Sequence, residues 1–195
     1  MAKTAKNRKQ LETLVLGGIL TALVVVLQYM GSFIKFGPFS ISLVLIPIVI
    51  GAATCSTKIS TWLGLVFSVV VLALDASAFF AISVPGTIIT VLAKGTACGL
   101  TAGLAYKLIH KKNEYAAVIA SAIVCPITNT GIFLLGCAVF FFKTIQEWGI
   151  GAGYANAIEY MFLGLAGGNF LFEMATNIIL CPVIIRILNI RKKSK

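Results

Sequence analysis

The sequence has little charge for its length. Only 11% of its 195 residues are charged, whereas 59% are hydrophobic. A soluble domain is usually about 25% charged and about 45–50% apolar, because its surface must be solvated. The composition therefore excludes a soluble enzyme, a disordered tail and a secreted disulfide scaffold, and it predicts an all-α polytopic membrane protein.

Groups that carry chemistry are also scarce. The chain has one histidine, His110, and only 6 acidic residues. Its 5 cysteines contain no CxxC pair and no zinc-ligand spacing, so they are interpreted as small apolar helix residues. G-x-x-x-x-G-K-[ST], G-x-S-x-G and metalloprotease motifs are missing. We therefore expect neither an enzyme nor a bound metal or cofactor.

Positive charge is in excess, with a formal net charge of +10. The basic residues cluster before the first apolar run and at the end of the chain, and they are not interleaved with aromatics as in a nucleic-acid groove. They are typical of the flanks of membrane spans, so no nucleic-acid partner is expected. The basic start is followed by an apolar run too long for a signal peptide, which indicates a retained span.

Long uncharged runs locate the spans, because a crossing needs about 20 apolar residues. Glu12 and Lys35 bracket 22 uncharged residues, for example. The predicted helices cover residues 11–33, 40–53, 60–74, 87–109, 115–142 and 161–190. Residues 75–86 and 143–160 are expected to be outer loops. The second helix is short, which indicates tilting or partial burial.

The distribution of basic residues tests this six-span topology. In a six-span chain, 13 of the 16 lysines and arginines fall on the side of the termini, and only Lys35 and Lys143 fall on the other. The positive-inside rule then places both termini in the cytoplasm. We expect a basic cytoplasmic segment over residues 1–10, one transmembrane domain over residues 11–190, and a second basic cytoplasmic segment over residues 191–195.

Two ionisable residues lie within predicted spans, where each costs about 2.5–3.5 kcal/mol on insertion scales. Lys94 lies about 12 Å from the outer end of its helix and Glu173 about 20 Å from the outer end of its own. Polar neighbours accompany them. The candidate substrate-binding residues are Thr90, Lys94, Thr128, Asn129, Asn169 and Glu173.

These residues predict a polar cavity, open to the outside, between the helices at 87–109, 115–142 and 161–190. Lys94 would meet a ligand carboxylate or phosphate, and the asparagines would meet amide or hydroxyl groups. The alternative is that Lys94 and Glu173 pair with each other and that the asparagines form interhelical bonds.

Small residues mark two helix surfaces. Gly17 with Thr21, and Gly18 with Ala22, form small-xxx-small pairs, which permit close helix approach. They serve either packing within the bundle or docking to a partner. In the helix at 87–109, glycines recur every four residues and predict a smooth groove for a neighbouring helix.

The chain resembles the substrate-binding S component of energy-coupling-factor (ECF) vitamin transporters. The similarity covers nearly the whole chain and rests on its length, its span pattern and four stretches. These are residues 40–52 (SISLVLIPIVIGA), 62–67 (WLGLVF), 125–131 (CPITNTG) and 168–173 (GNFLFE).

The resemblance implies a multi-pass protein of a prokaryotic plasma membrane that binds a vitamin or related micronutrient tightly from outside. It also implies transport together with a shared transmembrane scaffold protein and two ATPase subunits. Docking in the family uses an Ala-x-x-x-Ala-type surface, which Gly18 and Ala22 would replace here. The main alternative is a self-sufficient ion-coupled carrier or channel. A membrane enzyme that acts on lipid would need a carboxylate or histidine cluster near an interface, and a structural assembly factor would show no stabilisation by a ligand.

Overall fold

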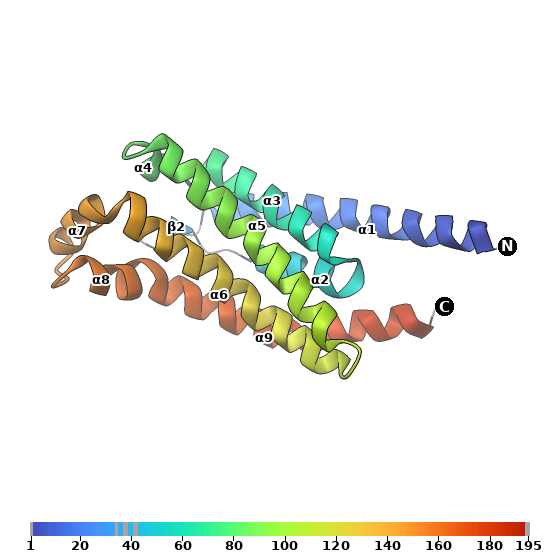
Figure 1. Ribbon diagram of the computed structural model, residues 1–195. Coiled ribbons are helices and arrows are strands. Elements are labelled where there is room, and N and C mark those ends of the chain that lie inside the picture. The colour runs from blue at the N-terminus through green and yellow to red at the C-terminus, as the bar shows by residue number, and fades with distance from the viewer. Residues whose placement is uncertain (1, 34, 37–38, 41–42, 194–195) are drawn as a thin grey trace.

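The computed structural model describes residues 2–33, 35–36, 39–40 and 43–193, and they form a bundle of long helices (Figure 1). The elements are α1 (Ala2–Gly31), β1 (Lys35–Phe36), β2 (Phe39–Ser40), α2 (Leu45–Thr54), α3 (Thr57–Leu74), α4 (Ser77–Phe80), α5 (Val84–Ile109), α6 (Glu114–Phe140), α7 (Phe142–Gly151), α8 (Ala157–Glu159), the π-helical η1 (Tyr160–Gly167) and α9 (Gly168–Lys193). β1 and β2 pair antiparallel, with Lys35 opposite Ser40 and Phe36 opposite Phe39.

Within the described residues, 5 helical segments are long and apolar enough to cross a membrane. They lie in α1, α3, α5, α6 and the continuous run Ala157–Ile190. The helix predicted at 40–53 is α2, which has 10 residues. It is about 15 Å long, half of a hydrocarbon core of about 30 Å, and most of it is buried. The predicted helix began at Ser40, which instead belongs to β2, and residues 41 and 42 lie outside the described part of the chain.

The helix starts follow local capping. Oγ of Ser56 accepts a hydrogen bond from the backbone N–H of Ile59 at the start of α3, and Oγ of Ser83 accepts one from Gly86 at the start of α5. Such caps satisfy first-turn donors that have no partner inside the helix. Because Ser83 caps α5, this helix begins at Val84 and not at residue 87 as predicted.

The two predicted outer loops are partly helical. Residues 75–86 contain α4, and residues 143–160 contain most of α7 together with α8. The expectation of a loop over 143–160 was therefore wrong at its start. Ile145 and Gly149 are buried on one face of α7, and this helical periodicity was masked by the polar and glycine residues around it.

Helix α5 makes its most extensive contacts with α3 and α6. Gly95, Gly99 and Gly103 face α3, as the four-residue spacing predicted. A Cβ atom at Gly103 would lie 2.7 Å from Cα of Thr57, so only glycine permits this approach. Oγ of Ser68 on α3 also donates to the carbonyl oxygen of Val91 on α5, at 2.8 Å.

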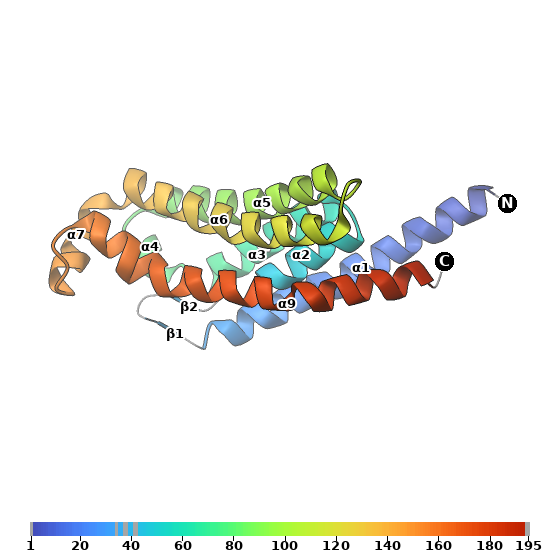
Figure 2. The ribbon, with the colours of Figure 1, turned by 90° about the horizontal axis from the view of Figure 1, so that it is seen from below.

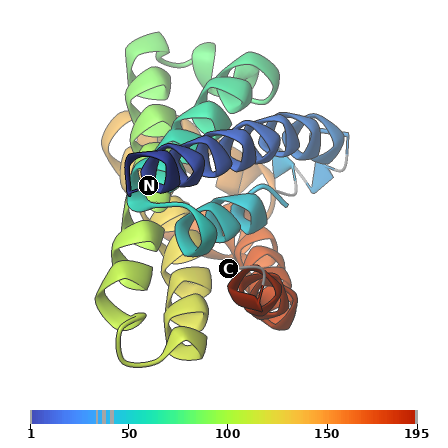
Figure 3. The ribbon, with the colours of Figure 1, turned by 90° about the vertical axis from the view of Figure 1, so that its right-hand side faces the viewer.

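The described chain begins and ends at the same end of the bundle (Figures 1 and 3). α1 and α3 run in the same direction, α5 returns, α6 runs with α3, and α9 returns (Figure 1). The β1–β2 hairpin and α2 lie between α1 and α3 in the chain, and the hairpin is seen beside α1 and α9 from below (Figure 2). The turns with α4 and α7 are at the opposite end (Figure 1).

Candidate functional site

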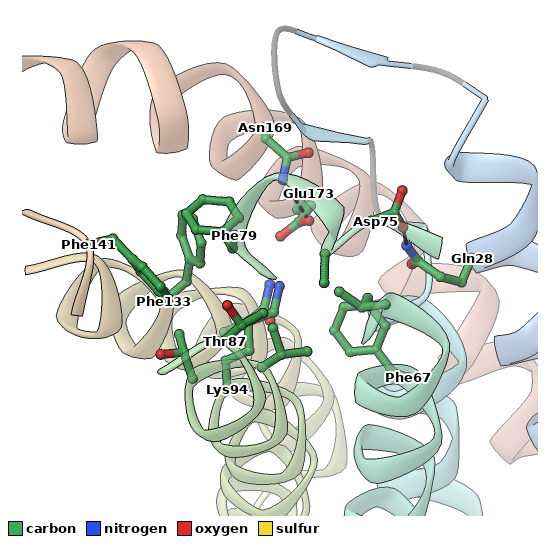
Figure 4. Close-up of a pocket in the computed structure, with 15 residues that line it drawn as sticks. Gln28, Phe67, Asp75, Phe79, Thr87, Lys94, Phe133, Phe141, Asn169 and Glu173 are labelled. Carbon is green, nitrogen blue, oxygen red and sulfur yellow. Dashed lines mark hydrogen bonds between the residues drawn. The ribbon is translucent and has the colours of Figure 1, made fainter. Parts of the chain in front are cut away.

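A cavity of about 70 Å³ lies inside the bundle, towards the end that carries α4 and α7 (Figures 1 and 4). On the same measure one water needs about 10–15 Å³, so the space admits several waters or a small organic molecule. The charged or polar lining residues are Gln28, Asp75, Thr87, Thr90, Lys94, Asn129, Asn169 and Glu173. The apolar lining residues are Phe67, Val71, Ala76, Phe79, Val91, Phe133 and Phe141.

Lys94 is the only lysine or arginine among the described residues that line this cavity. Its Nζ lies 5.4 Å from the ring centroid of Phe67 and 5.5 Å from that of Phe133. Within the described part of the chain, no carboxylate lies within 4.0 Å of Nζ as an ion pair. The ammonium is therefore held by cation–π contacts, and the pairing of Lys94 with Glu173 considered from the sequence is not formed.

Helix α9 contributes Asn169 and Glu173, one turn apart, immediately after the π-helical η1. Nδ2 of Asn169 donates to Oε1 of Glu173 at 3.1 Å, whereas Oε2 of Glu173 and Oδ1 of Asn169 are buried without a hydrogen-bond partner among the described residues. Oδ1 of Asn129 on α6 and Oγ1 of Thr90 on α5 are also buried and unpartnered. Polar atoms from three helices are thus left unsatisfied around one cavity, which native structures normally avoid.

A second polar pair closes the side next to α1. Nε2 of Gln28 on α1 donates to Oδ2 of Asp75, the residue that ends α3, at 2.7 Å (Figure 4). Neither Gln28 nor Asp75 was among the substrate-binding residues predicted from the sequence. A glutamine in the middle of the first apolar run was the signal for Gln28, and its 1% exposure confirms burial.

Aromatic side chains cover the cavity at the α4–α7 end. The ring of Phe79 on α4 packs edge-on against Phe133, Phe141 and Trp148, with centroids 5.8, 5.0 and 5.9 Å away, respectively. α7 supplies Trp148, and Phe141 precedes that helix. These rings separate the polar lining from the end of the bundle and lower the local dielectric.

Five of the six predicted site residues line this cavity: Thr90, Lys94, Asn129, Asn169 and Glu173. Thr128 does not. Oγ1 of Thr101 on α5 donates to Oγ1 of Thr128 at 2.9 Å, so Thr128 joins α5 to α6. Its side chain points away from the cavity because neighbouring helical residues are about 100° apart around the axis.

The two small-residue pairs of α1 face different ways. Gly17 is buried, and a Cβ atom there would lie 3.3 Å from Cδ1 of Ile59 on α3. Thr21 accepts a hydrogen bond from Nε1 of Trp62, also on α3, at 3.3 Å. Gly18 and Ala22 are exposed, and nothing lies within 4 Å of a Cβ atom at Gly18. Only the second pair lies on the exposed face of α1.

The fold and cavity define a multi-pass helical membrane protein built to bind a small molecule. The chain matches the family model of the ECF transporter substrate-specific component over residues 12–185. It therefore belongs to that family, whose members are substrate-binding transporter components and not enzymes. Comparison with curated proteins and with solved structures returns no match.

Proposed function

We propose that the chain captures a small, polar, vitamin-like micronutrient in this cavity and delivers it as the substrate-binding subunit of an ECF transporter. The observation that carries the proposal is the convergence of Lys94 with unpartnered buried atoms of Thr90, Asn129, Asn169 and Glu173 (Figure 4). Leaving such an atom unpaired costs about 1–3 kcal/mol, and a bound ligand would remove that cost.

The charges suggest the chemistry of the ligand. Lys94 offers N–H donors and favours a carboxylate or phosphate on the ligand. Glu173 and the side-chain oxygens of Asn129 and Asn169 accept hydrogen bonds, so they favour ligand N–H or O–H groups. A small anionic molecule that also carries hydroxyl or amide groups matches both the donor Lys94 and the acceptor oxygens of the cavity, and the aromatic rings match its apolar part.

The directions of the helices support six crossings. Because α1 and α3 run in the same direction, the chain between them must return across the membrane (Figure 1). α2 covers about half of that return, and it is shielded by its neighbours because most of its residues are buried. The basic residues near the termini and near the α5–α6 turn then favour a cytoplasmic location for both termini, in a prokaryotic plasma membrane.

The outward face of α1 is the proposed docking surface for the transmembrane scaffold that carries two ATPase subunits. Gly18 and Ala22 have small side chains, so another helix can approach the backbone closely on this face, and the exposed side chains of Leu14 and Ile19 flank them. Gly17 and Thr21 contribute indirectly, because they fix α1 against α3.

Binding is tested by thermal stability of the detergent-purified chain. The ligand set contrasts the carboxylates pantothenate, biotin and nicotinate with cationic thiamine and neutral riboflavin. A ligand at 1,000 times its dissociation constant stabilises the folded chain by about 4.1 kcal/mol, and we expect a carboxylate to do so.

Lys94→Met should weaken binding about 10- to 100-fold, since a hydrogen bond to a charged group contributes about 1.5–3 kcal/mol. Thr128→Val is the matched control and should bind normally. Tight binding by Lys94→Met would contradict the assignment.

Transport separates the proposed subunit from a self-sufficient carrier or channel. Proteoliposomes that contain the chain alone should not accumulate the ligand, whereas addition of the scaffold and ATPases with ATP should start uptake. Gly18→Leu should abolish assembly while ligand binding persists. Gly131→Leu, at another exposed helix glycine with open space around it, is the control. Uptake by the chain alone would favour the carrier.

A further inference from the structure

A second, larger cavity lies at the end of the bundle where α1 begins and α9 ends. It measures about 390 Å³ and is lined by residues of the α2–α3 turn and of the last turns of α5. Its polar lining consists of Ser56, Thr57, Lys58, Tyr106, Lys107 and His110, and no carboxylate is among the described residues that line it. We refer to it as the basic cavity.

No described residue forms an ion pair with the lysines of the basic cavity. Lys58 and Lys107 are exposed and form no ion pair within 4.0 Å with any described residue. The nearby carboxylate of Glu114 accepts a hydrogen bond from Oη of Tyr106 at 3.5 Å, outside the cavity lining. Two lysines thus converge from different helices, which favours an anion between them.

The remaining groups strengthen this preference. Nδ1 of His110 donates to the carbonyl oxygen of Lys107 at 2.9 Å, and its ring stacks on Tyr106 with centroids 5.4 Å apart. The ring is therefore held in place, and its Nε2 can donate to an anion only when the imidazole is protonated. The N-terminus of α3, at Thr57 and Lys58, adds the positive end of a helix dipole to the lysine charges.

The surroundings distinguish a lipid from a soluble anion. Leu104 and Leu108 lie on α5 next to Lys107, and they are 42% and 78% exposed. Residues four apart share one helix face, so Leu104 and Leu108 form an exposed apolar stripe beside the α5 residues that line the basic cavity. A phosphate with acyl chains contacts both features at once, whereas a free phosphate uses only the first.

We infer that the basic cavity binds the phosphate headgroup of an anionic phospholipid, with its acyl chains along Leu104 and Leu108. Basic pockets between transmembrane helices on the cytoplasmic side bind such headgroups in general. Binding here is independent of ligand capture in the first cavity. It would hold the α2–α3 turn and the end of α5 at the membrane surface.

The test is native mass spectrometry of the full chain in detergent, titrated with phosphatidylglycerol, phosphatidylcholine or glycerol 3-phosphate. We expect wild type to retain phosphatidylglycerol in preference to the other two. The double variant Lys58→Gln/Lys107→Gln should bind phosphatidylglycerol about 30-fold more weakly, since each lysine near an anionic surface contributes about fivefold. Lys111→Gln/Lys112→Gln removes the same charge from exposed positions outside the cavity and should bind as wild type.

Four outcomes would overturn the inference. Equal losses in the two double variants would indicate general surface attraction. Equal retention of phosphatidylcholine would remove the role of the anionic headgroup. Glycerol 3-phosphate binding as tightly as the lipid would indicate a soluble anion. Unchanged lipid binding by Lys58→Gln/Lys107→Gln, with loss of scaffold assembly, would identify the cavity as a protein-docking surface. Melting temperatures of both variants establish that each is folded.

Discussion

The contact between α3 and α5 permits a quantitative test of the packing. A Cβ atom at Gly64 would lie 3.0 Å from the carbonyl carbon of Gly95, closer still to its oxygen, and 3.3 Å from the nitrogen of Gly99. These backbone atoms cannot rotate away. Gly64→Ala must therefore separate the two helices by more than about 1 Å, because the closest contact, with the carbonyl oxygen of Gly95, sets the distance that has to be restored.

The expected cost follows from this geometry. Overpacking lowers the free energy of unfolding by about 1–3 kcal/mol. Because the clash is with backbone atoms, which cannot move aside, we expect Gly64→Ala to cost about 3 kcal/mol, at the upper end of that range. Alanine recovers about 1 kcal/mol through its higher helix propensity, which leaves a net loss of about 2 kcal/mol. At about 2–4 °C per kcal/mol for a chain of this size, the melting temperature should fall by about 4–8 °C.

Gly131→Ala is the matched control, because no atom lies within 4 Å of a Cβ atom at that position of α6. Its melting temperature should be unchanged or up to about 4 °C higher, from helix propensity alone. Both variants are heated in detergent, and the monodisperse fraction is measured by size-exclusion chromatography. The reasoning fails if Gly64→Ala melts at or above wild type while Gly131→Ala behaves as expected.

Three further predictions concern the site and the topology. Thr128→Val should lower stability by about 1 kcal/mol through loss of its 2.9 Å bond to α5, with ligand affinity within twofold of wild type; a large affinity loss would place Thr128 in the site. Asp75→Ala removes an acceptor from buried Gln28 and should lower the free energy of unfolding by about 1–3 kcal/mol. Asp75→Asn should have a stability between those of Asp75→Ala and wild type, and equal melting temperatures for wild type and both variants would contradict the prediction. Cysteine labelling tests the topology in a background without reactive cysteines. Glu147→Cys should react with an impermeant maleimide in intact cells, whereas Lys112→Cys should react only after permeabilisation. The opposite pattern would show that the termini lie outside the cell.

The ends of elements were harder to predict than their existence. The long apolar helices were located to within a few residues, apart from α1, which extends from Ala2 through the basic segment. The difference at the start of α5 arose from one side chain, Ser83, whose capping bond is not part of the hydrophobic pattern. α7 was missed because only part of its surface is apolar, and burial of Ile145 makes it pack.

The site was predictable where a polar residue lay deep in an apolar run. Lys94 and Glu173 stand out because charge in a lipid environment is costly. Asp75 did not stand out, because it ends a helix and a carboxylate there has many ordinary uses. Its approach to Gln28 joins residues 47 positions apart in the chain, and no local pattern encodes such a distance.

The sequence by itself determined the membrane class, the approximate spans and most of the polar residues that enter the bundle. These properties depend on the length of apolar runs and on the cost of burying charge, which are local quantities. Only the tertiary structure decided that Thr128 joins two helices, that Gly18 faces outward while Gly17 faces α3, and that two lysines from different helices share a second cavity. Helix rotation and crossing decide these relations, and they are set by packing between segments distant in the sequence.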